Sequence, residues 1–216
     1  GAEEMEAIGN NSVRVMEHLL LDKQNGGSVI NNITRARENG RAVQDHITKE
    51  VWQCLNDYHH LIRDKNIYTQ VKSGDPVTAL DSLIYQGMLY HGTVDITMAR
   101  GEGFNYLNAG KFLERAILSA DMLNIKLTEL GYKLEAPVEL PALRYLLYSL
   151  SGYELYLKSH RGNLQADFVI QQIVYNEQFP HSIAYCLKQL FRYFERLEPE
   201  SLPENYKQLE FLIGRA

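Results

Sequence analysis

Residues 103–131 read "GFNYLNAGKFLERAILSADMLNIKLTELG", and this stretch decides the fold class of the 216-residue chain. Apolar residues recur three or four positions apart, which is the spacing of one face of an α-helix. Gly131 follows the last of them, and glycine is typical of the position just past a helix end. The stretch therefore predicts a long helix over residues 104–130. Its apolar face comprises Ala109, Leu113, Ala116, Ala120, Leu123, Leu127 and Leu130.

The middle of this helix carries two adjacent charges, Glu114 and Arg115. Neighbouring residues on a helix point about 100° apart, so the two side chains cannot pair with each other. Each must meet a partner on another element or reach solvent. We expect Glu114 to pair with Arg37 or Arg41. The candidate partners for Arg115 are Asp45, Asp95 and the carbonyl groups at a helix C-terminus.

A second helical stripe runs through residues 29–63, where apolar or small residues again alternate at steps of three and four. Ser28 fits the N-cap of this helix, and Thr48 marks a bend or a restart within it. The polar segment 64–75 then separates this helix from the next one. The pattern predicts one long helix over 29–63.

Asp75 and Pro76 predict the start of the following helix, because Asp suits the N-cap and proline the first helical position. We expect this helix to end near Gly101 or Gly103. Strand-like alternation is nowhere sustained, so the chain is predicted to be a single all-α domain over residues 1–216, a bundle of seven to nine helices. Further helices are predicted over 141–159, 166–175, 181–198 and 204–213, with a turn at 161–163.

Residues 20–33 and 174–187 resemble each other at a constant offset of 154 positions. Each stretch combines a short apolar segment, a polar turn and a serine before a long helix, which indicates duplicated helical hairpins. A duplication predicts a counterpart of helix 104–130 upstream of Gly1, so we expect the chain to be a fragment that begins inside the first repeat. Asp22, Gln24 and Ser28 match Asn176, Gln178 and Ser182.

The charge, the apolar runs and the cysteines of the chain limit the classes of function that fit it. The net charge of −5 argues against a broad nucleic-acid surface. No apolar run approaches the roughly 20 residues of a membrane span, and no signal-peptide pattern occurs. The two cysteines have no CxxC spacing, which fits reduced thiols in the cytoplasm. With neither a Glu-x-x-His signature nor a phosphate-binding glycine loop, the sequence predicts no metal and no cofactor.

Three stretches carry a resemblance to a known family: "TRARENGRAVQDHI" (34–47), "VDITMARGEGFNYLNAGKFLERA" (94–116) and "YELYLKSHRG" (153–162). They resemble the alpha-E domain family, bacterial helical proteins named for a Glu-Arg motif. The resemblance covers roughly residues 13–198, and the chain has Gln44 where the family usually has Arg. The family's own N-terminal Glu-Arg helix has no match in this chain. The matching residues include Arg37, Glu38, Asn39, Arg41, Val43, Asp45, Thr97, Met98, Arg100, Glu102, Gly110, Glu114 and Arg115.

The resemblance implies which kinds of protein the chain works with, but not which reaction it serves. Alpha-E proteins resemble partners of ATP-grasp-type ligases and transglutaminase-like proteins. It therefore implies an accessory or binding module of a bacterial amide-bond-forming or peptide-modifying system, with such a protein or a peptide-like ligand as its partner. The alternative is an enzyme that acts on an amide or peptide through an Arg/Glu/Asp cluster. No catalytic residues can be carried over.

The charged residues of these stretches form the candidate site. Arg37 and Arg41 lie one turn apart, and Arg41 can pair with Asp45 four positions later. Two guanidinium groups so placed tie helices together, grip a carboxylate or phosphate, or form a solvated face. We expect a largely buried cluster. Its candidate members are Arg37, Glu38, Arg41, Asp45, Asp95, Arg100, Glu114, Arg115, Asp121 and Arg161.

Overall fold

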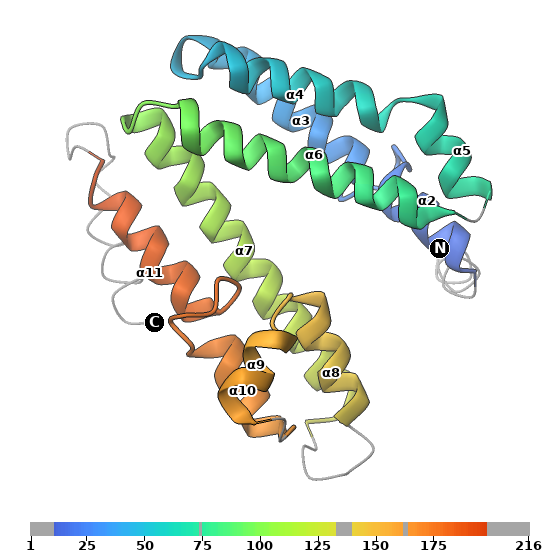
Figure 1. The fold of residues 1–216 in the computed structure, drawn as a ribbon, viewed down its shortest axis with the longest axis vertical. Helices are drawn as coiled ribbons and strands as arrows, with labels where there is room; N and C mark the ends of the chain where they lie inside the picture. Colours follow the sequence, from blue (N-terminus) through green and yellow to red (C-terminus); the bar gives the residue numbers. More distant parts are fainter. Residues whose placement is uncertain (1–10, 74, 133–139, 162–163, 198–216) are drawn as a thin grey trace. The chain divides into compact units, whose positions relative to one another are not determined.

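The computed structural model describes residues 11–73, 75–132, 140–161 and 164–197. Within these ranges the regular structure is entirely helical and comprises ten α-helices, so the all-α class is confirmed and the predicted count of seven to nine is slightly too low. The chain divides into two compact units, Gly1–Ala99 and Arg100–Ala216. Figure 1 gives the helices of each unit. That the whole chain forms one domain stays a prediction.

The first unit packs its helices around one apolar core. α3 and α4 run side by side, and α6 packs along α4 (Figure 1). The core contains Leu20, Ile30, Ile33, Ile62, Ile67, Val71, Ala79 and Leu83. The elements are α2 (Ser12–Leu20), α3 (Val29–Ala42), a 3-10 turn η1 (Gln44–His46), α4 (Lys49–Ile62), α5 (Lys65–Ser73) and α6 (Pro76–Thr97).

The prediction of one helix over 29–63 is wrong. The backbone leaves the helical region at Val43 (φ −120°, ψ 31°), and α4 restarts after Thr48, whose Oγ1 accepts a hydrogen bond from the Val51 amide at 3.3 Å. The two halves of the stripe fold back on each other instead. A Cβ atom at Gly40 would lie 2.7 Å from Leu55 Cδ1, so the glycine leaves the space that the Leu55 side chain of α4 occupies against α3.

The sequence analysis predicted a polar separator between helices at 64–75, but this segment contains the helix α5. Asp64 Oδ1 accepts a hydrogen bond from the Asn66 amide at 2.7 Å, and Ile67 and Val71 are buried in the core. Two apolar residues one turn apart are enough to anchor a short helix. α6 begins at Pro76 as predicted and ends at Thr97, a few residues before the expected stop.

The second unit is organised on its longest helix. α7 ends before Gly131 as predicted, and this glycine adopts the left-handed conformation with a φ of 58°. α11 lies along α7, and α8, α9 and α10 enclose a core with Leu143, Leu147, Tyr156, Val169 and Ile173 (Figure 1). The elements are α7 (Glu102–Glu129), α8 (Leu140–Ser149), α9 (Tyr153–His160), α10 (Ala166–Val174) and α11 (Ile183–Phe194).

The predicted helix 141–159 is interrupted, which separates α8 from α9. Ser151 has a φ of 55°, and a Cβ atom at the buried Gly152 would lie 2.6 Å from Phe179 Cζ. The ring of Phe179 therefore occupies the space that a side chain at position 152 would need. Arg161 ends α9 with a φ of 50°, as expected at the start of a turn. The rest of that turn and the predicted helix 204–213 lie outside the described residues.

Candidate functional site

The ten predicted site residues are divided equally between the two units. Arg37 and Arg115 are half-buried and the other eight are exposed, so neither unit buries the predicted cluster by itself. The expected pair of Glu114 with Arg37 or Arg41 joins residues of different units and stays a prediction. The first unit holds Arg37, Glu38, Arg41, Asp45 and Asp95, and the second holds Arg100, Glu114, Arg115, Asp121 and Arg161.

Arg37 stabilises the α3–α4 hairpin. Its Nε donates a hydrogen bond to Asn56 Oδ1 at 2.7 Å, and its guanidinium lies 5.5 Å from the centre of the Trp52 ring. Its Nη1 also lies 3.1 Å from a carboxylate oxygen of Glu38. Arg37 thus serves helix packing within its own unit, through Asn56 and Trp52, which the sequence analysis had not named as partners.

The predicted helical pair between Arg41 and Asp45 is wrong. α3 ends at Ala42, so Asp45 lies in the 3-10 turn η1 and not one helical turn beyond Arg41. The i,i+4 geometry requires both residues on one continuous helix.

Arg115 binds the turn that precedes α11. Its Nη1 donates a hydrogen bond to the carbonyl oxygen of Pro180 at 3.3 Å. One helical turn further, Ser119 Oγ donates to the carbonyl oxygen of His181 at 2.8 Å. The Cys186 thiol also lies 3.5 Å from the Pro180 oxygen. Side chains of α7 therefore hold two consecutive carbonyls of this turn. The candidates for Arg115 included a backbone carbonyl, but one at a helix C-terminus and not one in the turn before a helix.

The same contact affects two titratable groups. Burial, and then the positive charge of Arg115, lower the pKa of His181, so the imidazole is neutral in the fold. Burial raises the pKa of the Cys186 thiol, and Arg115 offsets only part of this effect. A fully buried thiol with a raised pKa is a poor nucleophile, so Cys186 acts as a core residue.

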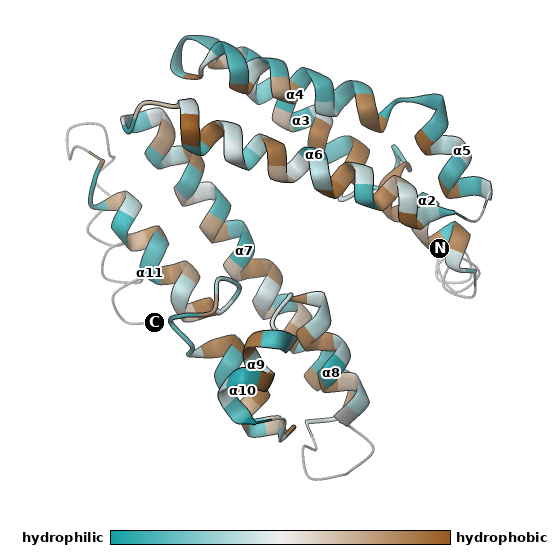
Figure 2. Cartoon of the chain, viewed as in Figure 1, coloured by the Kyte–Doolittle hydropathy of each residue, from teal (hydrophilic) through white to brown (hydrophobic). Residues whose placement is uncertain are grey.

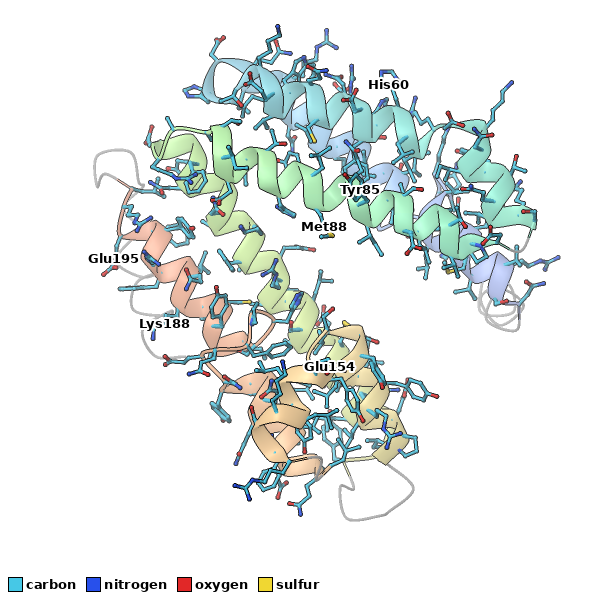
Figure 3. The ribbon with its side chains drawn as sticks, in the orientation of Figure 1. His60, Tyr85, Met88, Glu154, Lys188 and Glu195 are labelled. Carbon is cyan, nitrogen blue, oxygen red and sulfur yellow. The ribbon has the colours of Figure 1, made fainter. Side chains whose placement is uncertain are left out.

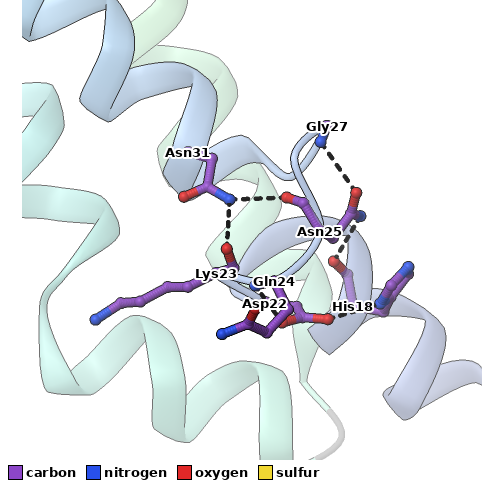
Figure 4. Close-up of polar contacts among 7 residues, drawn as sticks. All are labelled: His18, Asp22, Lys23, Gln24, Asn25, Gly27 and Asn31. Atoms are coloured by element: carbon purple, nitrogen blue, oxygen red, sulfur yellow. Dashed lines mark hydrogen bonds and ion pairs between the residues drawn. The ribbon is translucent and has the colours of Figure 1, made fainter.

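The first unit contains a polar turn between α2 and α3 (Figure 4). Asp22 accepts from the Gln24 amide through Oδ1 at 2.8 Å, and its Oδ2 lies 2.9 Å from His18 Nδ1. The hydrogen bond from Gln24 is the main cause of a lowered pKa of Asp22, and His18 adds to it. Asn31 Nδ2 donates to the carbonyl oxygens of Lys23 and Asn25, so the turn is closed by its own side chains.

Two adjoining hollows lie beside this turn. The side chains around them provide cations, carboxylates, an imidazole, a phenol and the Thr69 hydroxyl, a set that suits binding of a charged ligand. One is lined by Arg14, Glu17, His18, Leu21, Asp22, Lys23 and Tyr68, and the other by Lys23, Arg63, Lys65, Tyr68 and Thr69.

The turn recurs in the second unit at the offset of 154 residues. α10 and α11 begin 154 positions after α2 and α3, and α10 also ends 154 positions after α2. Asn176 Oδ1 accepts from the Gln178 amide at 2.9 Å, as Asp22 does from Gln24. Ser28 and Ser182 are both buried N-caps with nearly the same φ and ψ. The predicted order of short helix, polar turn and serine-led helix is thus present in both places.

A family model matches residues 2–216, essentially the whole chain, and describes an alpha-helical domain with a conserved ER motif, named Alpha-E. The chain belongs to the Alpha-E family. It is also similar to uncharacterized proteins of Mycobacterium bovis and Mycobacterium tuberculosis, each 22% identical over 175 residues. That alignment covers 80% of this chain and 20% of either relative, so the chain spans about a fifth of their length. No solved structure matches it.

In this Alpha-E chain, the two members of the Glu114–Arg115 pair lie in different environments. Arg115 faces α11, whereas Glu114 is exposed on the other side of α7. A Cβ atom at Gly110, one turn earlier, would meet nothing within 4 Å. Exposed apolar side chains surround Glu114 on this side of α7, namely Tyr106, Leu113, Ile117, Leu118 and Ile125.

The sequence analysis missed a second exposed face, on α6. Met88 is 67% exposed and projects from the side of α6 away from α4 (Figure 3), whereas Leu83 of the same helix is buried. Figure 2 shows that hydrophobic residues are spread around α6. The sequence could have predicted this exposed face, because a helix that is apolar on all sides needs a second element to cover it. The exposed apolar residues of this α6 face are Val77, Ile84, Tyr85, Met88, Leu89 and Ile96.

Two kinds of feature are absent from the described residues. None of their helices combines the length and the apolar character that crossing a membrane requires. Nor do three or more His, Cys, Asp or Glu side chains come together there in a way that could hold a metal ion.

Proposed function

We propose that this Alpha-E chain is an accessory binding module of a bacterial amide-bond-forming or peptide-modifying system located in the cytoplasm. Its partner is a protein, an ATP-grasp-type ligase or a transglutaminase-like protein, that binds the α6 face. The observation that carries the proposal is this face itself. Six large apolar side chains are exposed along one helix, and Ile96 among them is 84% exposed. Soluble monomers rarely expose contiguous apolar patches of this kind without a binding role.

The energetics favour association. Burying one large aliphatic or aromatic side chain contributes about 1.5–3 kcal/mol. Several such side chains together offset the loss of translational and rotational freedom on binding, which costs at least about 4 kcal/mol.

The charges on α6 indicate the character of the partner. The helix contains no Lys or Arg, while Asp81 and Asp95 are exposed on it. A partner surface that is apolar and flanked by basic side chains would complement it. The relatives are about five times as long as the matched segment, which fits a module that works beside other protein parts.

The proposal is tested by measuring the affinity of the purified chain for an ATP-grasp-type ligase and for a transglutaminase-like protein from the same host. We expect one of them to bind. Met88→Glu should weaken that binding at least about tenfold, since a charge at the centre of an apolar interface costs more than 1.4 kcal/mol. The matched control is Gln53→Glu, which adds the same charge at an exposed position of α4. Equal affinity of both variants, or no binding of either partner to the unchanged chain, would overturn the proposal.

A further inference from the structure

The two matching hairpins differ in what covers them. In the second unit, α7 lies along α11, where Cys186 and Leu190 are buried with Phe112 and Ala116 of α7. The positions of α3 that correspond to Cys186 and Leu190, at the offset of 154 residues, are Asn32 and Ala36. Both are exposed. The face of α3 that matches the α7-binding face of α11 is therefore uncovered.

The two turns also differ in what binds their carbonyl groups. Arg115 and Ser119 of α7 donate to the carbonyl oxygens of Pro180 and His181. At the same offset in the first unit stand Gly26 and Gly27. Their carbonyl oxygens accept from Arg35 Nη1 at 2.9 Å and Asn32 Nδ2 at 3.1 Å, two exposed side chains of the neighbouring helix. Each turn thus presents the same two carbonyl acceptors. In the second unit their donors come from α7, and in the first unit they come from α3, the helix that the turn itself begins.

We propose that the α3 face formed by Asn32, Arg35, Ala36 and Asn39 binds an α-helix of the same type as α7. Such a helix carries an arginine and, one turn later, a hydroxyl residue, which take over the carbonyl oxygens of Gly26 and Gly27. The side chains of Arg35 and Asn32 are exposed, so they can rotate away from these two oxygens. Ala36 replaces the larger Leu190, so the incoming helix has room for a large apolar side chain at that position.

This surface is distinct from the α6 face and does not depend on the proposed function. Its partner is defined by two hydrogen-bond donors at a fixed spacing, whereas the partner of the α6 face is defined by apolar area and basic charge. The failure of one proposal therefore leaves the other standing.

The probe for the test is a peptide of residues 102–129, which is α7 itself, added to the isotope-labelled full chain. We expect the peptide to shift the backbone NMR signals of Gly26, Gly27 and α3. The charged variant Ala36→Glu should weaken this binding at least about tenfold, and circular dichroism would establish that the variant is folded. Gln53→Glu on α4 should leave it unchanged.

Variant peptides are needed as controls, because the probe can also replace the chain's own α7 on α11. The peptide with Arg115→Ala and Ser119→Ala should lose the shifts at Gly26 and Gly27, whereas Ile117→Ala, at an exposed position of α7 that points away from Arg115, should keep them. Shifts confined to Cys186 and the rest of α11, or shifts at α3 that survive Ala36→Glu, would overturn the proposal. So would the absence of any shift in α3.

Discussion

Arg115 on α7 donates a hydrogen bond to the backbone carbonyl of Pro180, 65 residues later in the chain. With Ser119 it connects α7 to the turn that starts α11, and both bonds end on main-chain oxygens. A partner of this kind cannot be found by matching opposite charges in a sequence. The arginine of the Glu-Arg pair is thus part of the scaffold of its unit, and Glu114 remains available on the exposed side of α7.

Arg115→Ala should lower the free energy of unfolding by about 0.5–1.5 kcal/mol, because the Pro180 carbonyl loses a charged hydrogen-bond donor. Denaturant titration of the full chain measures the change. The control is Arg192→Ala, which removes an exposed arginine of α11 and should change the free energy by less than about 0.5 kcal/mol. Equal effects of the two variants would contradict a specific role for the Pro180 contact.

The two buried N-cap serines should respond differently to alanine. Ser182 Oγ donates to the Asn176 carbonyl at 2.6 Å and accepts from the Tyr185 amide at 3.0 Å, so Ser182→Ala should cost about 1–2 kcal/mol. Ser28 Oγ has no hydrogen-bond partner among the described residues, so Ser28→Ala should be neutral or slightly stabilising. Hydrogen exchange of the first turns of α3 and α11 would reveal the difference. Similar losses at both sites would show that Ser28 has a partner in solution.

Two glycines should give effects of opposite sign. Gly152→Ala should destabilise the chain by about 1–3 kcal/mol, because its Cβ would overlap the buried ring of Phe179. Gly110→Ala should stabilise it by about 0.5–1 kcal/mol, since alanine favours a helix and meets no neighbour there. Thermal unfolding of both variants is the measurement. A destabilised Gly110→Ala would mean that another element closely approaches this part of α7.

Asp22 should make the first unit sensitive to acid. Its pKa is lowered in the fold, so its contribution to stability is present above the ordinary aspartate pKa of about 3.9 and is lost as the pH falls through the lowered value. Asp22→Asn should remove this dependence and keep the turn, because Asn176 holds the matching turn in the same way. An NMR titration of the Asp22 carboxyl group would measure its pKa in the fold. A midpoint at or above the ordinary aspartate value would contradict the prediction.

Local signals in the sequence predicted local structure well. Asp75 and Pro76 located the start of α6, and Gly131 located the end of α7. The 154-residue offset predicted two matching turns, because the bonds that close them span only a few residues, as from Asp22 to Gln24. Each of these features is local, because it depends on the conformational preference of one residue or on bonds that span only a few positions.

Signals that depend on distant neighbours were read incorrectly. Residues 29–63 keep one unbroken stripe in the sequence, yet the chain reverses after Val43 because Gly40 lets Leu55 pack against α3. Met88 and Leu83 both fit a helical pattern, and only the packing of α6 decides that Leu83 is buried and Met88 exposed.

The sequence by itself determined that this chain is helical, where several of its helices begin or end, and that one helical hairpin occurs twice. These properties follow from periodicity and capping, which act within a few residues. Only the tertiary structure decided that Arg115 binds a carbonyl 65 residues away, that α6 keeps an exposed apolar face, and that α3 lacks the cover that α7 gives α11. Periodicity fixes the direction in which a side chain leaves its helix, but the element that meets it there depends on the path of the whole chain.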